Sequence, residues 1–485
     1  MTNKVQLITY VDRFGSKDIH GLTSLLEGEL KGLFGGVHIL PFYYPIDGED
    51  AGFDPIDHLE VDPRLGSWAD IGTLSNKVEI MADLIVNHIS AKSPQFKDFI
   101  ENGEESKFSD LFLSYGKVFG KGASENDLLK IYRPRPGLPF TTFTFANGTP
   151  KLMWTTFTSN QIDIDVHSNT GKAYLDSILS VFQQYGIKMI RLDAAGYAIK
   201  KPGSSCFMID ETFDFIAQLS NKAREKGIKV LVEIHSHYLT QIEIAKKVDY
   251  VYDFALPVLV MDTLFNRNAA NLKNWIKIRP ENTFTVLDTH DGIGIMDVAS
   301  EGNKPGLIND SQLNAIVEKI HANSNGESLK ATGAAASNLD LYQVNCTYYD
   351  ALGGHDKAYL MARAIQLFIP GIPQIYYVGL LAQNNDMELL AKTRVGRDIN
   401  RHYFSKDEIT AGIKKTVVKK LIELIRARNM HPAFNGEFSL IESNHSLLKM
   451  EWRNADDWAI LEIDLEADDM HIGFSQSEGI SQIKL

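Results

Sequence analysis

The chain has 485 residues, of which 44% are hydrophobic and 23% charged, an ordinary composition for a globular protein of one to three domains. The net charge of −13 argues against non-specific nucleic-acid binding, and two cysteines cannot build a disulfide framework. No apolar run reaches the length of a membrane span, and MTNKVQLITYVDRFG lacks the regions of a signal peptide. We therefore expect a cytoplasmic protein that binds neither nucleic acid nor membrane.

The first part of the chain alternates between strands and helices. Apolar runs predict strands at 5–10, 36–41 and 80–86, and helical spacing predicts helices at 22–33 and 68–77. Ser67 precedes the second helix as a candidate N-cap. This alternation is typical of a parallel sheet with helices packed outside it.

The same rhythm returns after an interruption. Further strands are predicted at 189–193, 229–233, 250–255, 283–287 and 373–378, and helices at 171–185, 211–226, 241–247, 272–276 and 359–368. Eight strands with helices between them predict a closed (β/α)8 TIM barrel. A final helix is predicted at 416–429, followed by the alternating pattern of an antiparallel β domain.

The interruptions define the expected domain organisation. The polar, Gly/Pro-rich stretch 89–168 is too long for an ordinary loop and predicts an inserted subdomain B, and a Gly/Asn/Ser-rich stretch at 292–355 predicts a second inserted loop subdomain. The barrel would then comprise residues 1–88, 169–291 and 356–435, and the small C-terminal β domain residues 436–485.

Charged and histidine side chains follow the apolar strands. Because the C-terminal ends of barrel strands converge on one face, these side chains should share a cleft with two residues of the loop after the second strand. The expected set is Asp50, Phe53, His88, Arg191, Asp193, Glu233, His235, His290 and Asp291.

Three interpretations of this set remain open. Arg191 and Asp193 share one strand face and could be a buried ion pair that only stabilises the strand end. A metal site is disfavoured because no HExxH spacing occurs, and the HxH pattern at His235 lacks a third ligand nearby. The favoured interpretation is a pair of carboxylates that cleaves a glycosidic bond.

The expected roles follow from the neighbours of each carboxyl group. Asp193, beside Arg191, would be the ionised nucleophile, because a nearby cation favours the charged form. Glu233 follows an apolar strand and would be the general acid/base. Asp291 would stabilise the positive charge that develops in the transition state.

Four short motifs then carry a resemblance. Residues 83–88 (DLIVNH), 191–193 (RLD), 233–235 (EIH) and 290–291 (HD) resemble the signature regions of the α-amylase family, glycoside hydrolase family 13, and QIDID at 161–165 resembles its fifth region. The resemblance implies a retaining double displacement through a covalent β-glucosyl-enzyme, with the two carboxyl groups about 5 to 5.5 Å apart. Asn87 matches a calcium ligand of many amylases.

Within that family, the chain is similar to the sucrose-cleaving phosphorylases. The segments that carry this likeness include GVHILPFYYPIDGEDAGFDPIDH, YRPRPGLPFT, IRLDAAGYAIKKPGSSCF, ATGAAASNLDLYQVN and GRDINRH. It implies sucrose and inorganic phosphate as substrates and glucose 1-phosphate and fructose as products, and it allows a homodimer. It also implies, despite Asn87, that no metal is required and that no cofactor is needed. Gly196-Tyr197 replaces the Lys-His of many amylases, which fits an acceptor site that is not an open polymer groove.

The likeness also assigns substrate-binding residues to the two halves of the cleft. The transferred glucosyl unit would be bound by Asp50, Phe53, His88, Phe157, Gln161, Arg191, His290 and Arg397. The fructose or phosphate side would be formed by Arg135, His235, Asp340, Tyr342 and Gln343, and Tyr197 is a further expected substrate-binding residue.

The acceptor side also follows from charge. A phosphate dianion that enters beside carboxylates needs a cation, and the planar fork of Arg135 suits phosphate oxygens. The Gly/Ala/Ser-rich lead-in to Asp340 and Tyr342 predicts a loop that changes shape between acceptors. For each of these segments a purely structural interpretation remains open instead of substrate binding. These interpretations are a stiff surface loop at 133–137, a surface turn at 338–343, a helix-capping salt bridge at 396–402, and core packing of Phe53 and Phe157.

Two other activities share the same carboxylates. One is phosphorolysis of a related glucoside, such as sucrose 6-phosphate, glucosylglycerol or glucosylglycerate, and the other is hydrolysis or transglucosylation of sucrose. A binding protein without catalysis is disfavoured because all three carboxylates are present.

Overall fold

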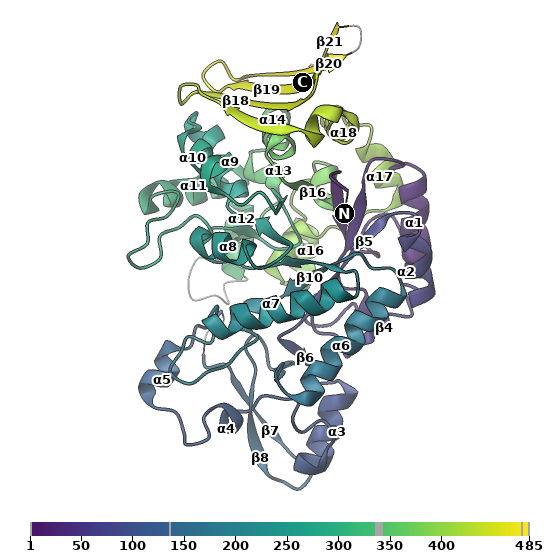
Figure 1. The fold of residues 1–485 in the computed structure, drawn as a ribbon, viewed down its shortest axis with the longest axis vertical. Helices are drawn as coiled ribbons and strands as arrows, with labels where there is room; N and C mark the ends of the chain where they lie inside the picture. The colour runs from purple at the N-terminus through teal and green to yellow at the C-terminus, as the bar shows by residue number, and fades with distance from the viewer. Residues whose placement is uncertain (1, 135–136, 335–342, 477–478, 484–485) are drawn as a thin grey trace.

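Eight short parallel strands close into a barrel in the computed structural model, which describes residues 2–134, 137–334, 343–476 and 479–483 (Figure 1). Around the barrel the strands follow the order β1-β16-β13-β12-β11-β10-β5-β2, and neighbouring strands are parallel. The strands are β1 (Gln6–Thr9), β2 (Gly36–Ile39), β5 (Glu79–Ile85), β10 (Met189–Asp193), β11 (Lys229–Val232), β12 (Tyr250–Asp253), β13 (Thr283–Thr285) and β16 (Ile372–Tyr376). The predicted (β/α)8 barrel is confirmed.

Amphipathic helices cover the outside of the barrel. In α6 (Asn169–Gln184), the residues Leu175, Ile178, Leu179 and Phe182 are buried at helical spacing, and Ser168 caps the N-terminus by accepting a hydrogen bond from the Gly171 N–H at 2.9 Å. The other covering helices are α1 (Ile19–Glu27), α2 (Trp68–Ser75), α7 (Asp210–Glu225), α8 (Tyr238–Ala245), α9 (Leu256–Asn266), α10 (Ala270–Ile278), α14 (Asp356–Phe368) and α18 (Thr416–Met430).

Several helices differ from the sequence prediction, among them α1 and α9. Helix α1 begins three residues before the predicted start because the Asp18 carboxylate accepts a hydrogen bond from the Gly21 N–H at 2.7 Å, and it ends at Glu27, before Gly28. Helix α9 was not predicted. Its first eight residues are all buried, so its sequence lacks the polar face that reveals a helix.

The stretch predicted as subdomain B projects from one end of the molecule as helices and short strands (Figure 1). Its elements are β6 (His88–Ser90), α3 (Pro94–Asn102), α4 (Tyr115–Val118), α5 (Glu125–Lys130), the hairpin β7 (Phe140–Thr144) and β8 (Pro150–Trp154), and β9 (Gln161–Asp163). A small apolar cluster inside it contains Leu113, Phe119, Ile131 and Trp154, and Cys206 from the barrel side completes the cluster. The last strand, β9, pairs with β6 and so returns the chain to the barrel mouth.

The second interruption contains helices where a loop was expected. These are α11 (Asp310–Asn323), α12 (Glu327–Ala334) and the short α13 (Tyr348–Ala351), with the small strand pair β14 (Ile293–Gly294) and β15 (Gln343–Val344). Helix α11 buries Leu313, Ile316, Val317 and Ile320 on one face, and this packing stabilises a helix that its polar composition concealed.

A five-stranded antiparallel sheet ends the chain, as predicted. It consists of β17 (Glu437–Ile441), β18 (Leu447–Asn454), β19 (Asp457–Asp464), β20 (Asp469–Gln476) and β21 (Gly479–Ile483), and it lies against α14 and the 3-10 turn Pro432–Asn435 at the end opposite the insertion (Figure 1). Between β16 and α18 the chain forms α15 (Tyr377–Leu380), α16 (Met387–Thr393), a 3-10 turn at Gly396–Asn400 and α17 (Lys406–Gly412).

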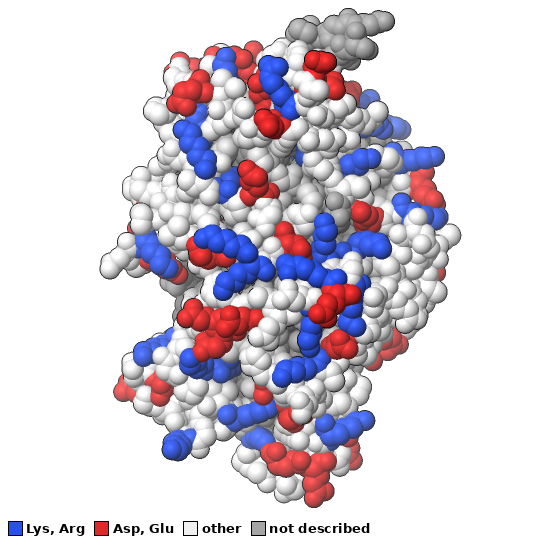
Figure 2. All heavy atoms as spheres, in the orientation of Figure 1, with Lys and Arg blue, Asp and Glu red and all other residues white. Residues whose placement is uncertain are grey.

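The surface carries both signs of charge. On the face drawn in Figure 2, basic and acidic side chains are interspersed across the barrel and the insertion. Among the described residues, every helix is too short or too polar to cross a bilayer.

Candidate active site

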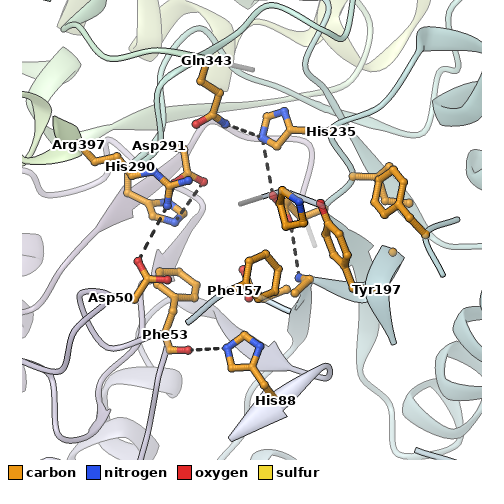
Figure 3. A pocket seen from close by; sticks show the side chains of 17 residues that line it. Asp50, Phe53, His88, Phe157, Tyr197, His235, His290, Asp291, Gln343 and Arg397 are labelled. Atoms are coloured by element: carbon orange, nitrogen blue, oxygen red, sulfur yellow. Dashed lines mark hydrogen bonds and ion pairs between the residues drawn. The ribbon is translucent and has the colours of Figure 1, made fainter. Parts of the chain in front are cut away.

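A pocket of about 820 Å³, its open mouth included, lies at the C-terminal ends of the barrel strands. Twelve of the predicted site residues line it together, namely Asp50, Phe53, His88, Phe157, Asp193, Tyr197, Glu233, His235, His290, Asp291, Gln343 and Arg397 (Figure 3).

Two predicted residues lie just behind the pocket wall. Arg191 is buried under the carboxylates, and Gln161 is buried beside the Asp50 loop, where its Nε2 donates to the Asp50 carboxylate at 3.4 Å. Arg135, Asp340 and Tyr342, predicted for the acceptor side, lie outside the described residues.

Arg191 connects the predicted nucleophile and the predicted acid/base. One of its terminal nitrogens lies 2.9 Å from Asp193 Oδ1, and the other lies 3.7 Å from Glu233 Oε1. Behind it, the fully buried Asp83 accepts a hydrogen bond from Arg191 at 2.6 Å and pairs with His38 Nε2 at 2.9 Å. Burial disfavours the Asp83 anion, but His38 and Arg191 outweigh it and lower the pKa of Asp83 to about 2.

Burial and the neighbouring charge of Arg191 act in opposite directions on the pKa of Asp193. Burial raises the pKa of Asp193 well above its usual range, and the carboxyls of Glu233, Asp83 and Asp291 add to this, while Arg191 opposes it. Burial alone would therefore put the proton on Asp193. The Arg191 contact is shorter to Asp193 than to Glu233, which favours the negative charge on Asp193.

Asp291 is the carboxylate with the strongest positive surroundings. Arg397 approaches its Oδ1 to 3.0 Å and Arg401 to 3.9 Å. Although burial opposes ionisation, Arg397, His290 and Arg401 hold the pKa of Asp291 well below its usual range. Arg397 also lies 4.0 Å from Asp50 Oδ1, so the 3-10 turn that carries it joins two acidic loops of the pocket.

Aromatic rings and neutral imidazoles form the wall around Asp50. The His290 ring stacks on Phe53 with centroids 4.9 Å apart, and His88 Nε2 donates to the Phe53 carbonyl at 3.0 Å. Burial lowers the pKa of His88, and it holds the pKa of His290 well below its usual range. Phe157 meets His88 and Tyr197 edge-on, so it lies at the pocket wall and not in the barrel core.

The opposite wall is built around His235. Its ring stacks on Phe254 with centroids 3.9 Å apart, its Nδ1 lies 3.0 Å from Asp297 Oδ2, and its Nε2 lies 3.3 Å from Gln343 Nε2 (Figure 3). Tyr197 packs against Phe207 on the same side, with ring centroids 4.6 Å apart.

Sequence reasoning missed several residues that build the site. Arg401 and Asp297 support the pocket from behind, and Pro134, Ala194, Gly196, Phe207 and Ile234 complete its lining. Most of these residues lie in or beside sequence motifs named above, such as GRDINRH and RPRPG. Their proximity to a motif was the sequence feature that could have predicted a place in the site.

Lys200 was also missed. Its buried ammonium donates to Asn87 Oδ1 at 3.0 Å and to the Tyr197 carbonyl, and pairs with the fully buried Asp163 at 2.7 Å. An ammonium thus contacts Asn87, the residue that resembles a calcium ligand of amylases.

One group in the pocket has the spacing of a cation site among the described residues. Donor atoms of Glu233, His235 and Asp291 lie within 4.8 Å of one another. Arg191 and Arg397 stand beside the two carboxylates, and these fixed positive charges disfavour a metal ion between them.

A barrel with three such carboxylates and two arginines at its C-terminal face defines an α-amylase-type carbohydrate-active enzyme. In agreement, residues 10–227 match the model of the α-amylase catalytic domain.

The chain is similar to characterised relatives over most of its length. It is 59% identical to the sucrose phosphorylase of Agrobacterium vitis over 93% of both chains. It is 52% identical to that of Bifidobacterium adolescentis, over 95% of this chain and 92% of the relative. The crystal structure of sucrose 6F-phosphate phosphorylase from Thermoanaerobacter thermosaccharolyticum superimposes with a TM-score of 0.91 at 38% identity, covering 100% of this chain and 98% of the other.

The chain therefore belongs to the sucrose phosphorylase family, within the α-amylase family of glycoside hydrolases. It is an enzyme of the glycosyltransferase type, a phosphorylase.

Proposed function

We propose that this enzyme cleaves sucrose with inorganic phosphate to give α-D-glucose 1-phosphate and D-fructose, reversibly and with retention. The observation that supports it most directly is the pocket of three carboxylates and two arginines in a chain 59% identical to a sucrose phosphorylase. The enzyme works in the cytoplasm, and we propose a homodimer, which light scattering on the purified protein would test.

The first half of the proposed reaction forms a covalent intermediate. Asp50, His88, His290 and Arg397 bind the glucosyl hydroxyls, and Phe53 and Phe157 contact the apolar ring face. Glu233 then protonates the bridging oxygen while the Asp193 carboxylate attacks the anomeric carbon, and fructose leaves. Asp291, kept ionised by Arg397 and Arg401, stabilises the oxocarbenium-like transition state.

The second half replaces fructose with phosphate. The carboxylate of Glu233 takes the proton of the incoming phosphate, a phosphate oxygen attacks the anomeric carbon, and Asp193 leaves as a carboxylate. Arg135, Tyr197, His235, Asp340, Tyr342 and Gln343 form the acceptor side in this proposal.

Related phosphorylases are the second candidate. The 38% identity to the sucrose 6F-phosphate enzyme, against 59% to a sucrose enzyme, favours sucrose itself. An acceptor panel of fructose, fructose 6-phosphate, glycerol and glycerate, each supplied with glucose 1-phosphate in the reverse reaction, distinguishes the members.

The decisive assay follows glucose 1-phosphate from sucrose and phosphate, beside a phosphate-free control. We expect phosphate-dependent glucose 1-phosphate. Free glucose released at the same rate with and without phosphate would mean a hydrolase and would overturn the proposal.

A further inference from the structure

Asp297 is a buried carboxylate behind the acceptor wall of the pocket. It is fully buried and accepts hydrogen bonds from Gln241 Nε2 at 2.8 Å and from the Ser236 N–H at 3.3 Å, and it pairs with His235 Nδ1 at 3.0 Å. The first two partners are neutral amides. Within the described ranges, His235 is the one partner of Asp297 that can carry a positive charge. A buried carboxylate without a countercharge costs several kcal/mol, so this contact favours a protonated ring.

The same contact orients the ring. Because Nδ1–H donates to Asp297 and the ring stacks on Phe254, Nε2 is directed at the pocket, 3.7 Å from Glu233 Oε1. The titratable groups that face the ring are Asp297 after β14, Glu233 at the end of β11 and Asp291 after β13. Burial opposes the charged imidazole, but these three carboxylates together raise the pKa of His235.

Two polar atoms converge on the acceptor space at this wall. His235 Nε2 and Gln343 Nε2 lie 3.3 Å apart, from different segments of the chain. A neutral ring whose Nδ1–H points at Asp297 can only accept at Nε2, and the Gln343 amide would then donate to it. Once Nε2 binds a proton, both atoms are donors, and a pair of donors aimed at one space suits an oxyanion.

We infer that Asp297 is a positioning residue for the second half-reaction. Asp297 keeps the His235 ring oriented and favours its imidazolium form when phosphate occupies the acceptor side. The proton comes from solvent as the dianion enters, and it offsets the repulsion between phosphate and the carboxylates of Glu233 and Asp291. This inference rests on the proposed function. It identifies the His235–Asp297 pair as one source of the enzyme's affinity for phosphate.

The test is Asp297→Asn, which preserves shape and removes the charge. The KM for phosphate should rise about 10-fold near neutral pH, the effect of losing about 1.4 kcal/mol of interaction. Asp262→Asn is the matched control, since Asp262 is equally buried among amide donors, Asn266, Asn271 and Gln312, on an outer helix.

The pH dependence separates charge from structure. The ratio of the variant KM to the wild-type KM cancels the titration of phosphate itself. It should be smallest at acidic pH, where both imidazoles are protonated, and grow as the pH rises, because Asp297 helps to raise the pKa of the wild-type ring and the variant lacks that charge. A ratio that is constant with pH, or an unchanged KM for phosphate, overturns the inference.

A second measurement applies if Asp297→Asn does not fold. The NMR spectrum of wild-type enzyme carrying ¹³Cε1-labelled histidine is recorded with saturating phosphate, and the His235 signal is the one that His235→Asn removes. That signal should have the chemical shift of an imidazolium. The chemical shift of a neutral imidazole would overturn the inference. A wild-type enzyme that makes no glucose 1-phosphate would instead overturn the proposed function.

Discussion

Arg191 determines how charge is distributed in the pocket. It is buried, it contacts Asp83, Asp193 and Glu233, and all three are acidic. His38 shares the charge of Asp83, so Arg191 faces mainly Asp193 and Glu233 on the pocket side. The retaining mechanism proposed above needs one carboxyl protonated and one ionised. The ion pair that the sequence left open as purely structural lies in the pocket, and its arginine is closer to Asp193 than to Glu233.

Replacing the proposed nucleophile tests this assignment. Asp193→Asn should lower phosphorolysis by about 10³-fold or more while the protein stays folded, because an amide cannot attack the anomeric carbon. Initial rates and circular dichroism measure the two effects. Asp176→Asn, on the outer face of α6 with a side chain 54% exposed, is the control and should retain full activity. Near-normal turnover by Asp193→Asn would refute the role.

Asp54 should make stability depend on pH in the mildly acidic range. It accepts hydrogen bonds from the Glu49 N–H at 2.9 Å and from Asn160 Nδ2 at 2.8 Å, yet burial raises its pKa from 3.8 to about 6. The folded state then binds a proton that the unfolded state has lost. This contribution is complete below about pH 4 and is lost as the pH rises through about 6, a change of about 3 kcal/mol.

Urea unfolding of the wild type and of Asp54→Asn, from about pH 4 to pH 7, checks this prediction. The free energy of unfolding of the wild type should fall relative to that of the variant as the pH rises. The difference cancels all other titrating groups, so two curves that stay parallel would contradict it.

At the scale of elements, the barrel and most of the pocket were predictable. Each barrel strand is a short apolar run, and the polar residues after the runs at β10, β11 and β13 meet because parallel strand ends converge. Helices α9 and α11 were not predictable. The first is apolar on all sides, and the second is stabilised by tertiary burial that overrides its polar composition.

Contacts between distant segments were also beyond sequence reasoning. Lys200 follows β10, whereas its partners Asn87 and Asp163 stand at the two junctions of the insertion with the barrel. Nothing in the local sequence indicates that these segments meet. The structure shows that one ammonium joins the insertion to the loop that carries Tyr197.

Removing this ammonium should therefore weaken the junction. Lys200→Met leaves the fully buried Asp163 without its ion-pair partner, and the cost should be about 3 to 5 kcal/mol of stability. Activity should fall as well, because the Tyr197 loop follows the proposed nucleophile. Lys201→Met is the control: its side chain is 55% exposed and pairs with Glu211, so it should change stability by less than about 0.5 kcal/mol. Equal melting curves for the two variants would show that the junction does not depend on Lys200.

At the scale of the molecule, the two ends of the chain close the barrel together. Arg428 of α18 donates to Asn3 Oδ1 at 2.7 Å, and Asn429 Oδ1 accepts from the Val5 N–H at 2.8 Å, immediately before β1. The C-terminal sheet packs on α14 and on the 3-10 turn Pro432–Asn435, and none of its described residues lines the pocket. Stability and catalysis should therefore separate between this sheet and the barrel mouth.

Trp452 tests that separation. Its indole is buried between the sheet and the barrel, donates to the Phe368 carbonyl at 2.6 Å and packs on Phe434 at 5.9 Å. Trp452→Ala should cost about 3 to 5 kcal/mol of stability by leaving a cavity. Because no described residue of the sheet lines the pocket, kcat/KM at a temperature where the variant is folded should change less than about 2-fold. Trp458→Ala, on the outer face of the same sheet, should cost clearly less stability. A large fall in kcat/KM for Trp452→Ala, with the fold intact, would mean that the sheet positions the active site.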